Sequence, residues 1–183
     1  IYGVSYHVRD VTTNLASHFG REAGVPFAVG LLHANVGGMV GAKNYAPCTL
    51  QDLRAADMDY WALGHIHRHA VLAVGRPTVV YCGNPQGRDP GEADARGCYL
   101  VTVDDVGDIH PEFRPADVVR WQILDVPIAD IPDEELLIER VADVDPSGTV
   151  LAPDATGAFV LAEGELTGHR HAIYDRVTMF RDD

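Results

Sequence analysis

The chain has 183 residues, of which 46% are hydrophobic and 22% charged, and its formal net charge is −13. This length suits one ordinary hydrophobic core with a small appendage. The composition is that of a soluble globular protein, and no apolar run approaches the ~20 residues that a membrane span needs. We therefore expect no membrane partner.

The negative charge lies almost entirely in the second half of the chain. Residues 1–100 hold eight acidic and eight basic side chains, whereas residues 101–183 hold nineteen and six. The balanced first half does not repel a phosphate ester, but no basic stripe indicates nucleic acid, so composition alone argues against DNA. Three single cysteines without a CxxC pattern (Cys48, Cys82 and Cys98) are typical of a reducing compartment, so we expect a cytoplasmic protein.

The chain opens inside an apparent strand, residues 1–6, so we expect a further part upstream of Ile1. Asp10 is a suitable cap for a helix over residues 11–21, which has apolar residues on one face. Residues 27–33 form a continuous apolar run that is typical of a buried central strand. That run ends in His33.

A long glycine-rich loop over residues 35–47 begins at Asn35, and loops of this kind often carry function. Thr49 and Asp52 then form a capping-box pattern that predicts a helix to about residue 56. Further strands are predicted at residues 60–63, 78–82, 97–103, 109–113 and 118–126, and one or two more after residue 158. Residues 132–141 predict a short helix, and residues 143–157 a loop or linker.

The apolar run at 60–63 is followed by Gly64, His65 and His67. In extended backbone, side chains two residues apart point the same way, about 6.7 Å along the strand. Two such imidazoles can bind one metal ion, or one ion each of a close pair. The glycine lets the backbone turn sharply out of the sheet. This stretch therefore predicts half of a metal site.

Three predicted strands end at polar residues, namely His33, the His65/His67 pair, and Gly83 with Asn84. Open sheets place their sites at such carboxyl ends. Imidazole suits zinc, manganese, iron and nickel, but two-metal sites also need carboxylates, and none stands at a matching strand end. A Gly-His-x-His pattern alone is weak, because residues 168–171 repeat it.

Four ordered segments carry a family resemblance, namely residues 31–36, 45–53, 60–67 and 81–88. Together they resemble the second half of a calcineurin-like metallophosphoesterase, specifically of the SbcD-type DNA repair exonucleases. Residues 118–121 and the Asp-Val-Pro-Ile that follows resemble the start of that family's DNA-capping segment. The resemblance covers roughly residues 1–141.

The resemblance implies an α/β fold, a calcineurin-like two-sheet β-sandwich flanked by helices in four αββα layers, incomplete at the N-terminus. It divides the chain into the C-terminal half of a metallophosphoesterase domain (1–116) and the start of the capping segment (117–142). A linker and tail of unknown role (143–183) follow.

The resemblance also implies a ligand set. His33 and His65 would bind one metal ion and His67 a second, both typically manganese, and water activated by the ions would hydrolyse a phosphodiester. Asn35, Gly83, Asn84 and Arg88 are expected to contact phosphate or to support the ligands. The family's first three motifs, with the bridging aspartate and the general-acid histidine, are absent, so no catalytic residue is expected in this chain. The chain alone should hydrolyse little.

We therefore predict a manganese-dependent exonuclease of DNA repair that acts on linear or broken DNA ends. An SMC-like ATPase subunit and a second copy of the chain are expected partners. A phosphatase or cyclic-nucleotide phosphodiesterase on the same scaffold, and a catalytically inactive fragment or interaction module, remain alternatives.

Overall fold

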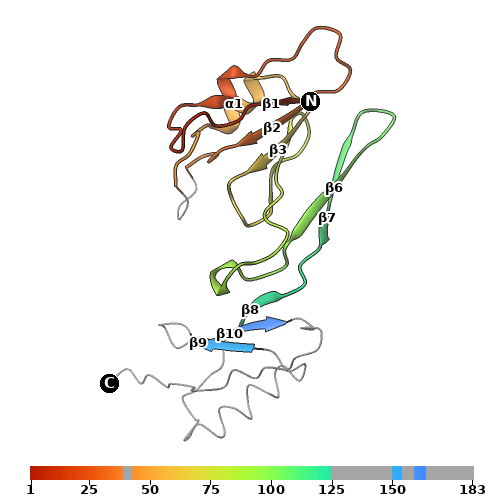
Figure 1. Ribbon diagram of the computed structural model, residues 1–183. Coiled ribbons are helices and arrows are strands. Elements are labelled where there is room, and N and C mark those ends of the chain that lie inside the picture. Colours follow the sequence, from red (N-terminus) through yellow and green to blue (C-terminus); the bar gives the residue numbers. More distant parts are fainter. Residues whose placement is uncertain (39–42, 125–149, 154–158, 164–183) are drawn as a thin grey trace, which may run out of the picture. The chain divides into compact units, whose positions relative to one another are not determined.

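The computed structural model describes residues 1–38, 43–124, 150–153 and 159–163 (Figure 1). The chain divides into two compact units. The first comprises Ile1–Asn84 with Gly97–Pro115, and the second comprises Pro85–Arg96 with Ala116–Asp183. No helix of the described residues is both long and apolar enough to cross a membrane.

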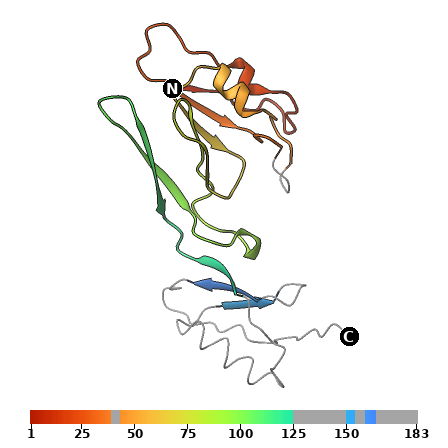
Figure 2. The same ribbon diagram turned by 180° about the vertical axis from the view of Figure 1, so that it is seen from behind.

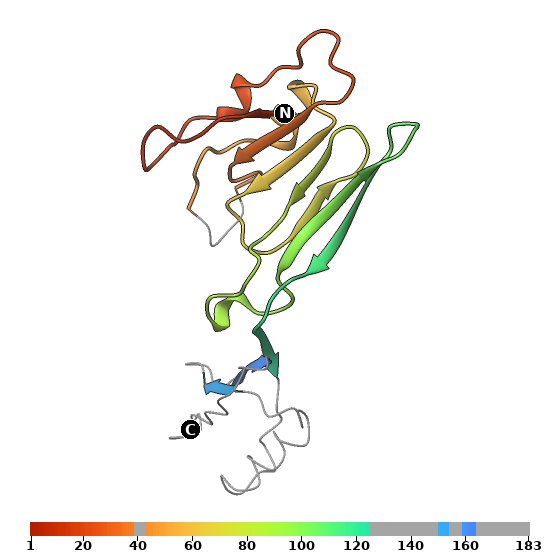
Figure 3. The same cartoon turned by 45° about the vertical axis from the view of Figure 1, so that its right-hand side comes forward.

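The first unit is built on a five-stranded sheet in the order β1-β2-β3-β5-β4 (Figure 3). All neighbours pair in parallel except β4 with β5. The strands are β1 (Tyr2–Gly3), β2 (Val29–His33), β3 (Tyr60–Gly64), β4 (Ala70–Ala73) and β5 (Thr78–Tyr81). The predicted strands at 27–33, 60–63 and 78–82 are confirmed within two residues, whereas β4 was not predicted.

One face of this sheet carries the core. Trp61 and Leu63 of β3 are buried together with Leu15 of the 3₁₀ helix η1 (Leu15–His18) and Leu53 of the α-helix α1 (Leu50–Ala55). Both helical segments lie on the same side of the sheet in Figure 2. The indole Nε1 of Trp61 donates a hydrogen bond to the Leu53 carbonyl at 3.1 Å, which fixes α1 against β3.

Gly30 of β2 leaves room for the Trp61 ring. A Cβ atom at Gly30 would lie 2.5 Å from that ring, so any side chain there would displace it. Gly30 and Trp61 are register partners of neighbouring strands. The absence of a side chain at Gly30 thus permits the large indole to pack flat on the sheet.

The two predicted N-terminal helices have different outcomes. The capping box of α1 is confirmed, because Thr49 accepts from the Asp52 backbone and Asp52 accepts from the Thr49 backbone. The predicted helix over 11–21, capped by Asp10, is wrong. Only η1 forms, with Asn14 as its cap and an extended Phe19 at its end. Residues 12–14 (Thr-Thr-Asn) have low helix propensity, which favours a short turn over a longer helix.

The strands predicted at 97–103 and 109–113 are confirmed and form a hairpin. Strand β6 (Gly97–Val103) pairs antiparallel with β7 (Ile109–Pro115). The ring of Phe113 stacks on His69 with centroids 3.8 Å apart, and the His69 Nδ1 lies 3.2 Å from the Tyr99 hydroxyl. These contacts join the hairpin to the loop that follows His67.

The second unit contains the 3₁₀ helix η2 (Pro90–Glu92) and a three-stranded sheet in the order β8-β10-β9. Its strands are β8 (Arg120–Leu124), β9 (Val150–Pro153) and β10 (Phe159–Glu163). The prediction of a loop over residues 143–157 is wrong at β9, which forms by pairing with β10. The predicted helix at 132–141 and the second Gly-His-x-His lie outside the described residues.

Gln86 secures the beginning of β8 within this unit. Its Oε1 accepts from the backbone of Val118 at 2.9 Å and of Val119 at 3.2 Å, and its Nε2 donates to the Val119 carbonyl at 2.5 Å. The amide side chain thus imitates a neighbouring strand. The architecture is mixed α/β with parallel and antiparallel pairing, consistent with a metallophosphoesterase fold. The four-layer arrangement and the three-segment division stay predictions.

Candidate metal centre

Two imidazoles meet at the carboxyl ends of neighbouring parallel strands. His33 is the last residue of β2, and its register partner on β3 is Gly64, directly before His65. The rings of His33 and His65 have centroids 5.1 Å apart with an interplanar angle of 64°. Burial lowers the pKa of His33, and the charges of His65 and His67 lower it further. His33 therefore lies within electrostatic range of both other predicted ligands.

The separation of the two rings fits a shared ion. With metal–nitrogen distances of about 2.1 Å and a ligand angle of about 90–110°, two imidazoles have centroids roughly 4.6–5.3 Å apart. The observed separation of His33 and His65 is within this range. No group of three or more His, Cys, Asp or Glu among the described residues is arranged to hold an ion by itself. The donor set thus suits a borderline divalent ion but needs further ligands.

Gly64 allows His33 to lie where it does. A Cβ atom at Gly64 would be 3.0 Å from the His33 Nδ1, closer than side chains ordinarily approach. The ring of His33 therefore covers the backbone at the end of β3. This gives the glycine of the Gly-His-x-His pattern a physical role at this position.

The backbone and ring of His65 are both constrained. Its φ is +104°, a left-handed value that non-glycine residues rarely adopt. Its Nε2 lies 2.6 Å from the Lys43 carbonyl oxygen. A carbonyl oxygen can only accept, so Nε2 carries the proton and the lone pair of the neutral ring is on Nδ1. Nδ1 is thus the nitrogen that His65 can offer to a metal.

Gly83 and Asn84 support the backbone next to His67. The Asn84 N–H donates to the His67 carbonyl at 3.2 Å. Gly83 has a φ of +75°, and a Cβ there would be 2.8 Å from the same carbonyl oxygen. These contacts restrain the backbone next to His67, and contact of either residue with phosphate stays a prediction.

The other two residues that sequence predicted have different surroundings. Asn35 is 1% exposed, and its backbone bonds to Tyr45 and Cys48 join the glycine-rich loop to the end of β2. Arg88 belongs to the second unit, where its guanidinium contacts the Glu92 carboxylate at 2.7 Å. Arg88 therefore has an ion-pair partner within its own unit, and its contact with phosphate stays a prediction.

Sequence reasoning did not identify two tyrosines beside the imidazoles. The ring of Tyr6 lies edge-on to His33 with centroids 5.5 Å apart, and the ring of Tyr45 lies at the same separation from His65. Tyr45 was noted only within a motif, and nothing local in the sequence distinguishes Tyr6.

Comparison with known proteins finds a bacterial relative. Over 143 residues the chain is 41% identical to the uncharacterized metallophosphoesterase YhaO of Bacillus subtilis (strain 168). This similarity supports the assignment of the chain to the metallophosphoesterase superfamily. The alignment covers 78% of this chain but 35% of the relative, so the chain spans about a third of that protein's length. No protein-family model matches the chain.

Proposed function

We propose that this chain supplies part of a two-metal phosphodiesterase site, in which His33 and His65 bind one divalent ion and His67 binds a second. The observation that carries the proposal is the meeting of the His33 and His65 rings, 5.1 Å apart, at adjoining strand ends. The similarity to a metallophosphoesterase supports the same chemistry. Manganese is the ion that we propose for both positions.

The ions would polarise phosphoryl oxygens and lower the pKa of an attacking water. The chain's own residues hold and orient the ligands. Gly64 makes room for His33, the Lys43 carbonyl fixes the proton of His65 on Nε2, and the Asn84 N–H restrains the backbone at His67. The resemblance assigns the bridging carboxylates and the proton donor for the leaving group to the family's first three motifs, which this sequence does not contain.

For the substrate we propose DNA, cleaved exonucleolytically at linear or broken ends. The support is the resemblance of residues 45–53 and of residues 118–121 to the SbcD-type exonucleases. An SMC-like ATPase partner, self-association and a cytoplasmic location accompany this proposal. A phosphatase or cyclic-nucleotide phosphodiesterase is the second candidate, since the same three imidazoles serve either substrate.

The test uses the complete gene product. We expect manganese-dependent degradation of end-labelled linear DNA that exceeds hydrolysis of a small chromogenic phosphodiester. His67→Ala should abolish the activity while the urea midpoint is unchanged, whereas His18→Ala, at an exposed histidine of η1, should change neither. Preference for the small substrate would favour the second candidate. Full activity of His67→Ala would reject the ligand assignment.

A further inference from the structure

We propose that Tyr6 and Tyr45 are positioning residues that bracket the His33–His65 pair and fix the orientation of both imidazoles before any metal binds. This inference rests on the proposed function, because it takes the two imidazoles as metal ligands. Four ring contacts close a cycle of Tyr6, His33, His65 and Tyr45. Their centroid separations, in that order around the cycle, are 5.5, 5.1, 5.5 and 6.3 Å.

Tyr6 holds His33 in two ways. Its hydroxyl donates a hydrogen bond to the His33 carbonyl oxygen at 2.6 Å. Its ring meets the imidazole almost perpendicularly, at an interplanar angle of 86°. Tyr6 follows β1 and is separated from His33 by 27 residues, so this is a tertiary restraint on the last residue of β2. The edge-on contact opposes rotation of the imidazole about its Cβ–Cγ bond.

Tyr45 and its backbone hold His65. The Tyr45 carbonyl accepts from the Asn35 N–H at 2.8 Å, and the Tyr45 N–H donates to the Lys43 carbonyl at 2.9 Å. That same Lys43 oxygen contacts the His65 Nε2 at 2.6 Å. The ring of Tyr45 therefore lies against His65 from the segment that also sets its tautomer. The Lys43 contact leaves Nδ1 as the nitrogen available to an ion, and the Tyr45 ring limits rotation of the imidazole.

The two restraints have a common consequence for affinity. An imidazole that already has the correct tautomer and ring angle loses less conformational freedom when an ion binds. Partners that orient metal-ligating histidines typically change affinity 10–100-fold when they are removed. The bracket is independent of any carboxylate, so its effect is present before the remaining ligands are supplied.

The test compares leucine and phenylalanine variants in the complete gene product. Mn²⁺ binding is titrated by the EPR signal of the free ion, and the ring nitrogens are observed by ¹⁵N NMR in the metal-free protein at pH 8. We expect Tyr45→Leu to weaken Mn²⁺ binding about tenfold. Without the Tyr45 ring against it the imidazole can rotate away from the Lys43 carbonyl, so the two His65 tautomers should mix. Tyr45→Phe keeps the ring and should restore both properties. Tyr6→Leu should weaken binding more than Tyr6→Phe, which loses only the hydroxyl.

Tyr2→Leu is the matched control, because Tyr2 is the first residue of β1 but its hydroxyl accepts from the Glu22 backbone. It should leave affinity and tautomer unchanged. Wild-type affinity in both leucine variants, or a His65 ring protonated on Nδ1 in the unaltered protein, would overturn the proposal. If no protein binds Mn²⁺ but Tyr45→Leu still mixes the tautomers, the proposed function fails and the bracket stands. If the tautomers are also unchanged, both fail.

Discussion

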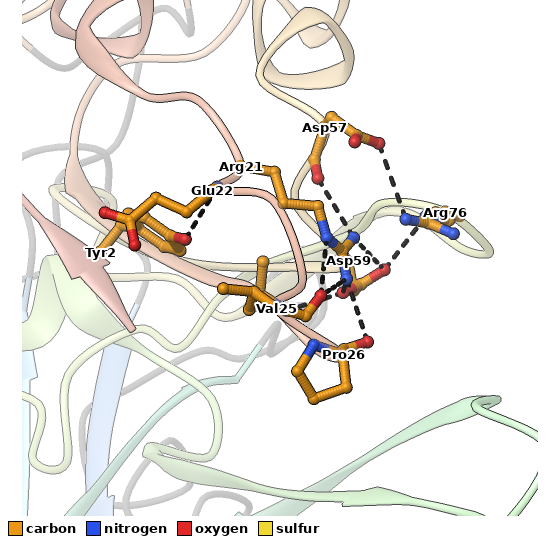
Figure 4. Close-up of polar contacts among 9 residues, drawn as sticks. Tyr2, Arg21, Glu22, Val25, Pro26, Asp57, Asp59 and Arg76 are labelled. Atoms are coloured by element: carbon orange, nitrogen blue, oxygen red, sulfur yellow. Dashed lines mark hydrogen bonds and ion pairs between the residues drawn. The ribbon is translucent and has the colours of Figure 1, made fainter.

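The two ends of strand β3 carry opposite kinds of polar cluster. Directly before the strand, the Asp59 carboxylate contacts Arg21 at 2.8 Å and Arg76 at 3.0 Å (Figure 4). It also accepts a hydrogen bond from the Ala28 N–H at 2.7 Å. Directly after the strand, His65 faces His33. No ion pair of the described residues joins a carboxylate to either of these imidazoles.

The Asp59 cluster before β3 stabilises the fold, whereas the arrangement of the imidazoles after β3 costs stability. Burial raises the pKa of Asp59, but the hydrogen bonds from Arg21 and Ala28 and the charges of Arg21 and Arg76 outweigh it, so this pKa is lowered. At the other end the pKa of His33 is lowered by burial and by neighbouring imidazoles, and His65 has a strained φ. Strain of that kind costs about 1–3 kcal/mol and is characteristic of functional sites.

The largest expected effect comes from breaking the ion-pair cluster of Arg21, Asp59 and Arg76 that precedes β3. Asp59→Asn leaves the Arg21 guanidinium, whose side chain is 14% exposed, without its charged partner. We expect the free energy of unfolding at pH 7 to fall by about 3 kcal/mol, the lower end for a broken buried pair, because Arg21 keeps its bonds to backbone carbonyls. Urea denaturation measures this loss.

Asp57→Asn is the control for that loss. Asp57 also pairs with Arg76, but at 3.6 Å and with its side chain 67% exposed. An exposed pair contributes at most about 1 kcal/mol. Equal losses in the two variants would contradict the assignment of Asp59 as the stabilising centre.

The second effect is on the packing of the strand between its two ends. Gly30→Ala brings a Cβ to 2.5 Å from the Trp61 ring. The indole must move, which we expect to lower the free energy of unfolding by about 1–3 kcal/mol. Gly3→Ala is the control, because a Cβ there would be 3.7 Å from its nearest neighbour. An unchanged urea midpoint in Gly30→Ala would show that the core can accommodate a methyl group at this position.

The sequence predicted the strands and α1 because their signals are local. Apolar runs coincide with β2, β3 and β5, and the Thr49 and Asp52 side chains complete a cap within four residues. The prediction failed at β9 and at the helix expected after Asp10. Strand β9 forms in a stretch of loop-like composition because β10 pairs with it. The expected helix near Asp10 is shortened to η1, where Asn14 is the cap instead.

For the candidate site, the sequence likewise indicated which histidines to consider but not their tertiary contacts. Strand ends and a Gly-His-x-His pattern identified His33, His65 and His67 as candidates, and the structure brings the first two into ring contact. The contact of His65 with the Lys43 carbonyl involves a backbone atom 22 residues away, which no side-chain pattern reports. Arg21 and Asp59 are 38 residues apart, and their pairing likewise depends on the tertiary fold.

A smaller expected effect is the loss of the Asp59 contribution to stability at low pH. Because the folded-state pKa of Asp59 is lowered, its contribution to stability is present above the unfolded-state value and is lost as pH falls through the folded-state value. We expect the difference in unfolding free energy between the unaltered protein and Asp59→Asn to be constant from about pH 7 to pH 5 and to shrink below about pH 4. Urea titrations at each pH measure it. A difference that persisted unchanged to pH 2 would show that the carboxylate charge is not its source.

The smallest expected effect on stability is at the carboxyl end of β3. Gly64→Ala would place a Cβ 3.0 Å from the His33 Nδ1, so the imidazole must shift by a few tenths of an ångström. The ring is exposed enough to move, so we expect the free energy of unfolding to change by less than about 1 kcal/mol. The His33–His65 geometry, however, would no longer suit one ion, and we expect Mn²⁺ affinity to fall about tenfold. Gly30→Ala should show the converse, with stability reduced and the affinity of the folded protein retained. If Gly64→Ala instead lost stability and kept its affinity, the end of β3 would be a packing site like its middle, and the contrast between the two ends of the strand would not hold.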